Sequence, residues 1–305
     1  MRLSDIGEFG LIERIKEWLG TKTIGDDCAP IDLGDRKLLL TVDAMVEEVH
    51  FRREYPPEAV GWKSISAGVS DVVGNGGEPL WVLVSLSLPD IEVSYVKRLY
   101  DGIGRACKFY GCEVVGGNIS RADRISLHIS VVGRSERFVG RSGAKAGDRL
   151  FVSGTLGDSR AGLELLLMGK EGYEPFELSL IERHLRPSAR IDYVGHLRKY
   201  ASASMDISDG LLIDAGHLSR RSGVRVDINT ANLPLSEELR RFCEKYNKDP
   251  LDYALRGGED YQLLFTHPMD KMNPFLDMTP VGEIKEGEGV YVDGYKVEPG
   301  GHTHF

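Results

Sequence analysis

Residues 124–132 read RISLHISVV, and the apolar Ile125, Leu127, Ile129 and Val131 alternate there with other side chains. This period of two is typical of a strand with one buried face. Upstream, residues 96–110 carry apolar side chains at spacings of three and four and are followed by Gly111, which predicts a helix that ends there. Further out, the pattern predicts a helix over 58–70 and strands over 37–46, 80–88 and 112–115. Strands and helices mixed without a strict βαβ rhythm favour an α+β fold over a doubly wound sheet.

The chain has 305 residues, which is more than one hydrophobic core usually organises, so we expect two domains. Residues 134–148, RSERFVGRSGAKAGD, are rich in charge and glycine, and they are the best candidate boundary. We therefore predict an N-terminal α+β domain over residues 1–136 and a C-terminal α+β domain over 137–305. For the second part we expect strands over 150–154, 224–228 and 262–265, helices over 158–168 and 211–221, and a hairpin at Asp293-Gly294.

Composition narrows the class of protein. The 47 acidic and 38 basic residues give a formal net charge of −9, which opposes binding to a nucleic-acid backbone. The N-terminus lacks the pattern of a secretory signal and no apolar run reaches membrane-spanning length, so we expect a cytoplasmic protein. The four cysteines show no metal-ligand spacing, which indicates reduced thiols. The 36 glycines are roughly 12% of the chain against an average near 7%, which favours tight turns and close approach to a ligand.

Acidic residues gather at positions where strands or helices end. Gly25-Asp26-Asp27 is a candidate metal site or a solvated turn, and Asp43 after LLLTV is a candidate ligand or a helix cap. In Asp206-Ile-Ser208-Asp209-Gly210, Ser208 or Asp209 could also cap the helix that follows. These acidic residues share one feature: their carboxylates are hard oxygen ligands of the kind that Mg²⁺ binds together with nucleotide phosphates. This pattern points to phosphoryl transfer. The set is Asp27, Asp43, Asp71, Asp206 and Asp209.

Other residues could bind phosphates or substrate. Gly116-Gly117-Asn118 and Gly257-Gly258-Glu259-Asp260 are predicted to form turns that offer backbone donors. Arg141 is either a mobile cation that reaches a triphosphate or an exposed, solvated arginine. His50 is either a substrate contact or a packed histidine. GxxxxGK[ST], the protein-kinase motifs and GxSxG are absent, which excludes a P-loop, a protein kinase and an α/β-hydrolase by motif.

Eight motifs in order closely resemble those of the thiamine-monophosphate kinase family, in the superfamily of aminoimidazole ribonucleotide synthetase. They are GEFGLI, GDDCA, TVDAMVEEVHF, VSDVVGNGG, GGNIS, GRSGAKAGD, MDISDGL and GGEDYQLLF, and they run from residue 7 almost to the end of the chain. The resemblance implies a two-domain fold with a mixed, barrel-forming N-terminal sheet and a homodimer joined through these sheets. It also implies direct in-line transfer from ATP to thiamine monophosphate, with several Mg²⁺ ions and room for a monovalent cation.

The resemblance assigns roles by position. The metal-binding positions are Asp27, Thr41, Val42, Asp43, Asp71, Asp206 and Asp209, of which Asp27, Asp43, Asp71 and Asp209 are also catalytic. The ATP contacts are Gly117, Asn118, Arg141, Ser208 and Tyr100, and the substrate contacts are His50, Glu259 and His302. The sequence departs from the family pattern at Val42, Glu48, Asn118 and His302. Two alternatives stay open: another ATP-dependent synthetase of the superfamily, and a nucleotide- or metal-binding regulator without turnover.

Overall fold

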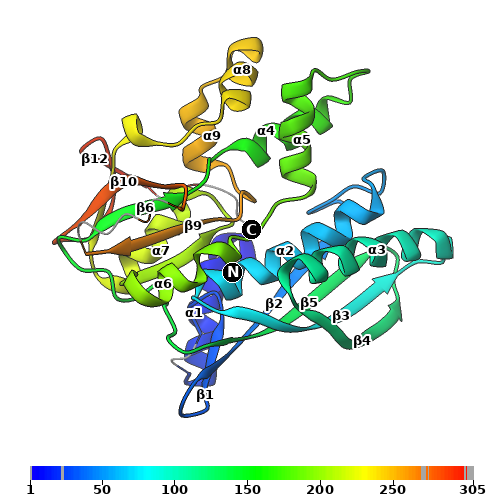
Figure 1. Ribbon diagram of the computed structural model, residues 1–305, viewed down its shortest axis with the longest axis horizontal. Helices are drawn as coiled ribbons and strands as arrows, with labels where there is room; N and C mark the ends of the chain where they lie inside the picture. Colours follow the sequence, from blue (N-terminus) through cyan, green and yellow to red (C-terminus); the bar gives the residue numbers. More distant parts are fainter. Residues whose placement is uncertain (1, 22–23, 269–272, 274, 299, 301–305) are drawn as a thin grey trace.

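Two mixed β-sheets organise the chain in the computed structural model (Figure 1), which describes residues 2–21, 24–268, 273, 275–298 and 300. The first sheet has five strands in the order β1-β2-β5-β3-β4, and the second has seven in the order β12-β11-β8-β10-β6-β9-β7. The strands of the first sheet are β1 (Ala29–Asp32), β2 (Lys37–Val46), β3 (Glu78–Leu88), β4 (Glu113–Arg121) and β5 (Ser126–Ser135). Those of the second are β6 (Arg149–Ser153), β7 (Ala203–Ile207), β8 (Arg225–Ile228), β9 (Gln262–His267), β10 (Met278–Lys285), β11 (Gly289–Val292) and β12 (Tyr295–Val297).

The first sheet buries one face and exposes the other. In β5, Leu127, Ile129 and Val131 are fully buried, as the alternation predicted. β5 pairs antiparallel with both β2 and β3, and its Ser130 lies opposite Val42 on one side and Leu83 on the other. Paired residues share a face, so Val42 and Leu83, which are both exposed, lie on the face opposite to Leu127 and Ile129.

Helices α2 (Pro57–Gly74) and α3 (Val93–Tyr110) lie together over the sheet of β2 to β5 (Figure 1). Their close approach requires glycine at two positions. A Cβ added at Gly61 would lie 2.1 Å from the Leu99 carbonyl oxygen, and a Cβ added at Gly102 would lie 2.0 Å from the Glu58 carbonyl oxygen. α3 connects β3 to the parallel strand β4 and ends at Gly111, whose φ of 73° is left-handed, as the sequence predicted.

Helices of the second part pack on the seven-stranded sheet or on one another. They are α4 (Asp158–Met168), α5 (Pro175–Leu185), α6 (Val194–Tyr200), α7 (Leu211–Ser222), α8 (Glu237–Tyr246) and α9 (Pro250–Arg256). The remaining elements are α1 (Gly7–Leu19) and the 3₁₀ helices η1 (Leu3–Asp5), η2 (Ile191–Tyr193) and η3 (Thr230–Asn232). α7 packs against β7, β8 and β11, and β11 and β12 form the hairpin expected at Asp293-Gly294.

The hydrophobic core is continuous between the two sheets. One apolar cluster runs from Ile129 under α2 to Phe265 on β9, and a second lies between the seven-stranded sheet and α7. The α+β fold is confirmed, and the domain division at residue 136 stays a prediction. No helix among the described residues is long and apolar enough to cross a membrane.

Candidate functional site

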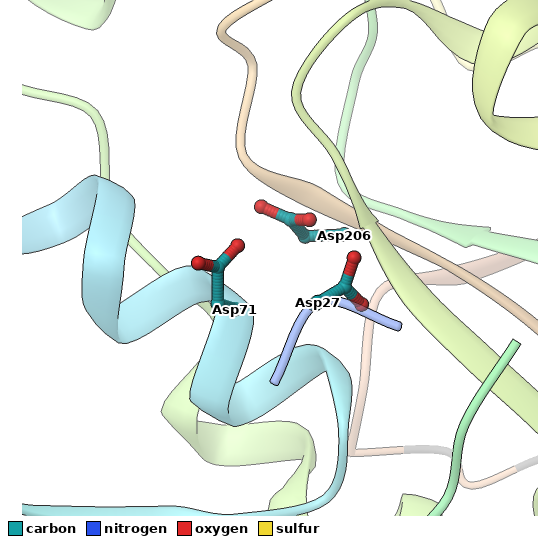
Figure 2. Close-up of side chains that lie close together, drawn as sticks. All are labelled: Asp27, Asp71 and Asp206. Atoms are coloured by element: carbon teal, nitrogen blue, oxygen red, sulfur yellow. The ribbon is translucent and has the colours of Figure 1, made fainter. Parts of the chain in front are cut away.

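Three aspartates from distant parts of the sequence converge between the two sheets. Asp27 lies just before β1, Asp71 is in the last turn of α2, and Asp206 is on β7. One carboxylate oxygen from each lies within 4.8 Å of the others, and Figure 2 shows the carboxylates of Asp71 and Asp206 close to that of Asp27. The sequence predicted that these acids act together, and the structure confirms that they meet.

The carboxylates are electrostatically unfavourable as a group. Burial, and then the neighbouring Asp27, raise the pKa of Asp206 to about 8. Burial and the charges of Asp206 and Asp27 raise the pKa of Asp71 well above its ordinary value, although Thr41 Oγ1 donates a hydrogen bond of 2.5 Å to it. Neither carboxylate oxygen of Asp206 makes a hydrogen bond of normal geometry within the described chain. A hard divalent cation fits this site because it would satisfy these oxygens and offset the repulsion.

Asn75 and Gly74 hold the three segments together. Asn75 is fully buried: its Oδ1 accepts a hydrogen bond of 2.8 Å from the Cys28 amide, and its Nδ2 donates to the Val139 carbonyl at 3.1 Å. A Cβ at Gly74 would lie 2.8 Å from the Asp206 amide nitrogen, so only glycine lets the end of α2 approach β7. The sequence predicted a helix over 58–70 but not this contact with β7.

Arg141 is not the exposed, solvated arginine of one interpretation of its sequence context, and its role as an ATP contact stays a prediction. Its guanidinium pairs with the Asp27 carboxylate, with Nε 3.1 Å from Oδ1, and its backbone amide donates to Asp26 Oδ1 at 2.5 Å. The side chain is only 18% exposed, so it is largely shielded from solvent. The physical reason is that Asp26 and Asp27, far away in sequence, supply carboxylates that fix it. The solvated-turn alternative for Asp27 is also wrong, because the Asp27 side chain is only 1% exposed.

A cavity of about 770 Å³ opens beside the carboxylates. It brings together most of the predicted site residues: Val42, Asp43, His50, Asp71, Asp206, Ser208, Asp209 and Glu259. It also includes Arg160 on α4 and Arg256 on α9, which no motif in the sequence had singled out. Val42 lines the wall, but its side chain has no metal-ligand atom.

The two capping alternatives are wrong. Asp43 lies within β2, and its carboxylate accepts a hydrogen bond of 2.7 Å from the Ala44 amide. The N-cap of α7 is Gly210, without a side-chain cap, and its amide donates to Asp214 Oδ2 at 3.2 Å. Ser208 and Asp209 therefore precede the helix. They line the cavity and do not cap the N-terminus of α7.

Four predicted ATP contacts are outside the lining of this cavity: Arg141, described above, and Tyr100, Gly117 and Asn118. Tyr100 is on α3, where its ring packs against the core, and Gly117 and Asn118 are in β4, the last strand of the sheet. The turn predicted at Gly116-Gly117-Asn118 is wrong, because Gly117 and Asn118 pair with Val84 and Ser85 of β3 and continue the strand. Residues 257–260 are irregular backbone after α9, and no turn is assigned to them. His302 lies outside the described residues.

The structure describes two of the predicted substrate contacts, His50 and Glu259, and different interactions hold their side chains in place. His50 Nδ1 accepts a hydrogen bond of 3.1 Å from the Val46 amide. Glu259 has a left-handed φ of 62°, and its carboxylate Oε1 lies 2.6 Å from the ammonium of Lys63, a buried residue of α2 that the sequence did not single out.

Comparisons with known proteins agree with this geometry. Residues 25–135 match the family model for AIR synthase related protein, N-terminal domain. Over 306 residues, the chain is 66% identical to a thiamine-monophosphate kinase from Aquifex aeolicus, with 100% of both chains covered. The chain belongs to the thiamine-monophosphate kinase family.

Other relatives extend the family likeness. A thiamine-monophosphate kinase from Haemophilus influenzae is 35% identical and covers 92% of this chain and 90% of its own. The structure superposes with a TM-score of 0.99 on AaThiL complexed with AMPPCP and TMP, which is 66% identical, over 100% of this chain and 99% of that one. The fold is therefore that of the aminoimidazole ribonucleotide synthetase superfamily, as the motifs implied.

Proposed function

We propose that this chain transfers the γ-phosphoryl group of ATP to thiamine monophosphate, giving thiamine diphosphate and ADP. The observation that carries the proposal is the group of buried, mutually repelling carboxylates beside a cavity of about 770 Å³. Membership of the family supplies the substrate, since the Aquifex relative is a thiamine-monophosphate kinase.

The cation that this site fits is Mg²⁺. Asp27, Asp71 and Asp206 would hold it from one side, and Asp43 and Asp209 are placed along the cavity wall to share further ions. Bound there, Mg²⁺ supplies neutralisation of the negative charge on the transferred phosphoryl group. The chain's own part is to keep these carboxylates in place: Asn75 fixes the Asp27 segment, and the Gly74 approach fixes α2 against β7.

The acceptor needs little activation. A phosphate monoester is largely ionised at neutral pH, so no strong general base is required. The cavity lining, in the part of the chain that is described, contains no cysteine, and its histidine is His50, whose Nδ1 is already occupied by the Val46 amide. We propose direct in-line transfer in which the protein orients both phosphates and excludes water.

We further propose a cytoplasmic homodimer joined through the five-stranded sheets. The open face of this sheet exposes Val42, Trp81 and Leu83 at 65%, 46% and 43%. Large exposed apolar side chains on one face are typical of an interaction surface. Gly117, Asn118 and Tyr100 lie on or beside this sheet, outside the cavity, so their assignment as ATP contacts rests on the family resemblance.

The test is formation of thiamine diphosphate by the purified chain. We expect ADP release only when ATP, thiamine monophosphate and Mg²⁺ are all present. Tight Mg-ATP binding without product would favour the non-catalytic regulator. ADP release with another acceptor alone would favour a different synthetase of the superfamily.

Substitution of Asp209 tests the metal assignment. We expect Asp209→Asn to lower kcat at least about 100-fold with the fold intact, because it removes an anionic oxygen ligand from the transition state. The matched control is Asp192→Asn, an exposed aspartate that pairs with Arg190 and lies outside the cavity. Turnover near that of the wild type would remove Asp209 from the catalytic set.

A further inference from the structure

Lys63 is a buried cation next to the cavity but not part of its wall. It lies on α2, its side chain is 5% exposed, and its ammonium is 2.6 Å from Glu259 Oε1. The small apolar space beside it is lined by Met45, Phe51 and Leu185, among others. In the part of the chain that is described, Glu259 is the carboxylate that pairs with this ammonium.

Glu259 is held so that one side of its carboxylate faces the cavity. Its side chain is 26% exposed and lines the cavity. Its left-handed backbone is uncommon for a residue other than glycine, and it is secured by a hydrogen bond of 2.7 Å from its amide to the Ser208 carbonyl. Two residues on, the Tyr261 amide donates to the Ile207 carbonyl at 3.0 Å.

The ion pair of Lys63 and Glu259 is expected to add little to the stability of the fold. Desolvation of a buried lysine and glutamate commonly cancels the gain from their attraction. The nearby His184 does not help to balance the carboxylate, because burial and the charge of Lys63 lower its pKa to about 3 and keep it neutral. Its Nδ1 lies 3.7 Å from Glu259 Oε2 and 3.0 Å from Ser159 Oγ.

α2 sets the distance between the two ends of the cavity. Lys63 and Asp71 are on the same helix, about 12 Å apart along its axis at 1.5 Å per residue. If the phosphate of the acceptor lies at the Asp71 end, as the proposed function requires, its organic part extends toward Glu259. A carboxylate there attracts hydrogen-bond donors and cations, and thiamine monophosphate carries both an aminopyrimidine and a thiazolium.

We propose that Lys63 is a positioning residue, whose ammonium holds the Glu259 carboxylate in place to recognise the amino or cationic ring of the acceptor. This inference rests on the proposed function, because it takes thiamine monophosphate as the acceptor. Lys63 acts through Glu259 and does not touch the reacting phosphates.

The test is the kinetics of Lys63→Met, which keeps an unbranched side chain one heavy atom shorter than that of lysine and removes its charge. We expect KM for thiamine monophosphate to rise at least tenfold, with kcat and KM for ATP within about twofold. Loss of an interaction with a non-reacting part of the substrate raises KM without lowering kcat. We expect Lys63→Arg to restore KM partly. The control is Lys170→Met, which removes the cation 2.6 Å from the buried Glu177, outside the cavity, and should leave both KM values unchanged.

A double-mutant cycle separates positioning from direct contact. If Lys63 acts through Glu259, then Lys63→Met combined with Glu259→Gln will be no worse than Glu259→Gln alone. Additive losses would mean that Lys63 contacts the substrate itself and would overturn the proposal. An unchanged KM for thiamine monophosphate, or a loss of kcat with lowered Tm and unchanged KM, would also overturn it.

Two further outcomes are distinguishable. If Lys63→Met does not fold, Lys63→Arg and its cycle with Glu259→Gln provide the same comparison, with an expected rise in KM of about threefold for Lys63→Arg alone. If the wild type forms no thiamine diphosphate, the proposed function fails, and the positioning role that depends on it fails with it. A wild type that turns over beside a Lys63→Met variant with normal KM rejects only the positioning role.

Discussion

The ionised form of Asp206 is strongly disfavoured in the folded, metal-free protein. It is 1% exposed, its oxygens lack hydrogen bonds of normal geometry within the described chain, and its pKa is raised from its ordinary value of 3.8 to about 8. Between these two pH values the folded, metal-free protein binds more protons at this position than the unfolded chain. Stability from this group is therefore fully present below about pH 4 and is lost as the pH rises toward 8.

Asp206→Asn tests this account of stability. In metal-free buffer, we expect the wild type to lose Tm between pH 5 and pH 8 more steeply than the variant, which cannot ionise there. Mg²⁺ should raise the Tm of the wild type at pH 8 and have little effect on that of the variant. Thermal unfolding at both pH values, with EDTA or with Mg²⁺, measures this. An equal pH dependence in the two proteins would contradict it.

Single residues also show where sequence reasoning was limited. Asp27, Asp71 and Asp206 could be predicted because each carboxylate stands in a motif with a recognisable chemistry. The pairing of Arg141 with Asp27, the hydrogen bonds of Asn75, and the burial of Lys63 depend on segments far apart in sequence. No local pattern encodes such contacts, so they could not be found from spacing.

At the scale of elements, α2 carries much of the site. It supplies Asp71, Lys63 and the C-terminal Asn75, and it packs against β2, β5 and β7. Elements with clear periodicity, such as β5 and α3, were predicted well. The end of β4 was not, because two adjacent glycines favour a turn locally, whereas pairing with β3 keeps them extended.

Gly74→Ala tests the contact between α2 and β7. The added methyl would lie 2.8 Å from the Asp206 amide nitrogen, so we expect a loss of about 1–3 kcal/mol in the free energy of unfolding, together with reduced turnover. The control is Gly104→Ala in α3, where nothing lies within 4 Å of the new Cβ. There, helix propensity should add about 0.5–1 kcal/mol. Urea unfolding measures both, and a neutral Gly74→Ala would show that the two elements can separate.

At the scale of the whole molecule, the two faces of the five-stranded sheet differ in what covers them. α2 and α3 cover one face, whereas Val42, Trp81 and Leu83 leave the other apolar and exposed within this chain. The homodimer proposed above would bury this face.

Leu83→Asp tests the homodimer. A charge at the centre of an apolar interface is costly to bury, so we expect the variant to sediment as a monomer while the wild type sediments as a dimer. Leu178→Asp is the control, because Leu178 on α5 is similarly exposed, at 52%, but lies away from the sheet. A monomeric wild type, or a Leu83→Asp variant that remains dimeric, would argue against this interface.

The convergence of Asp27, Asp71 and Asp206 also has a consequence for the assembly of the molecule. Positions 27 and 71 belong to the first part of the chain and position 206 to β7. Bringing these distant positions together carries a loop-closure entropy cost, which packing of the two sheets helps to offset. A fragment ending before β7 would keep two of the carboxylates and lack the third. If a divalent cation binds to all three, as proposed above, its binding will report completed folding of the chain and will itself favour the last step of that folding.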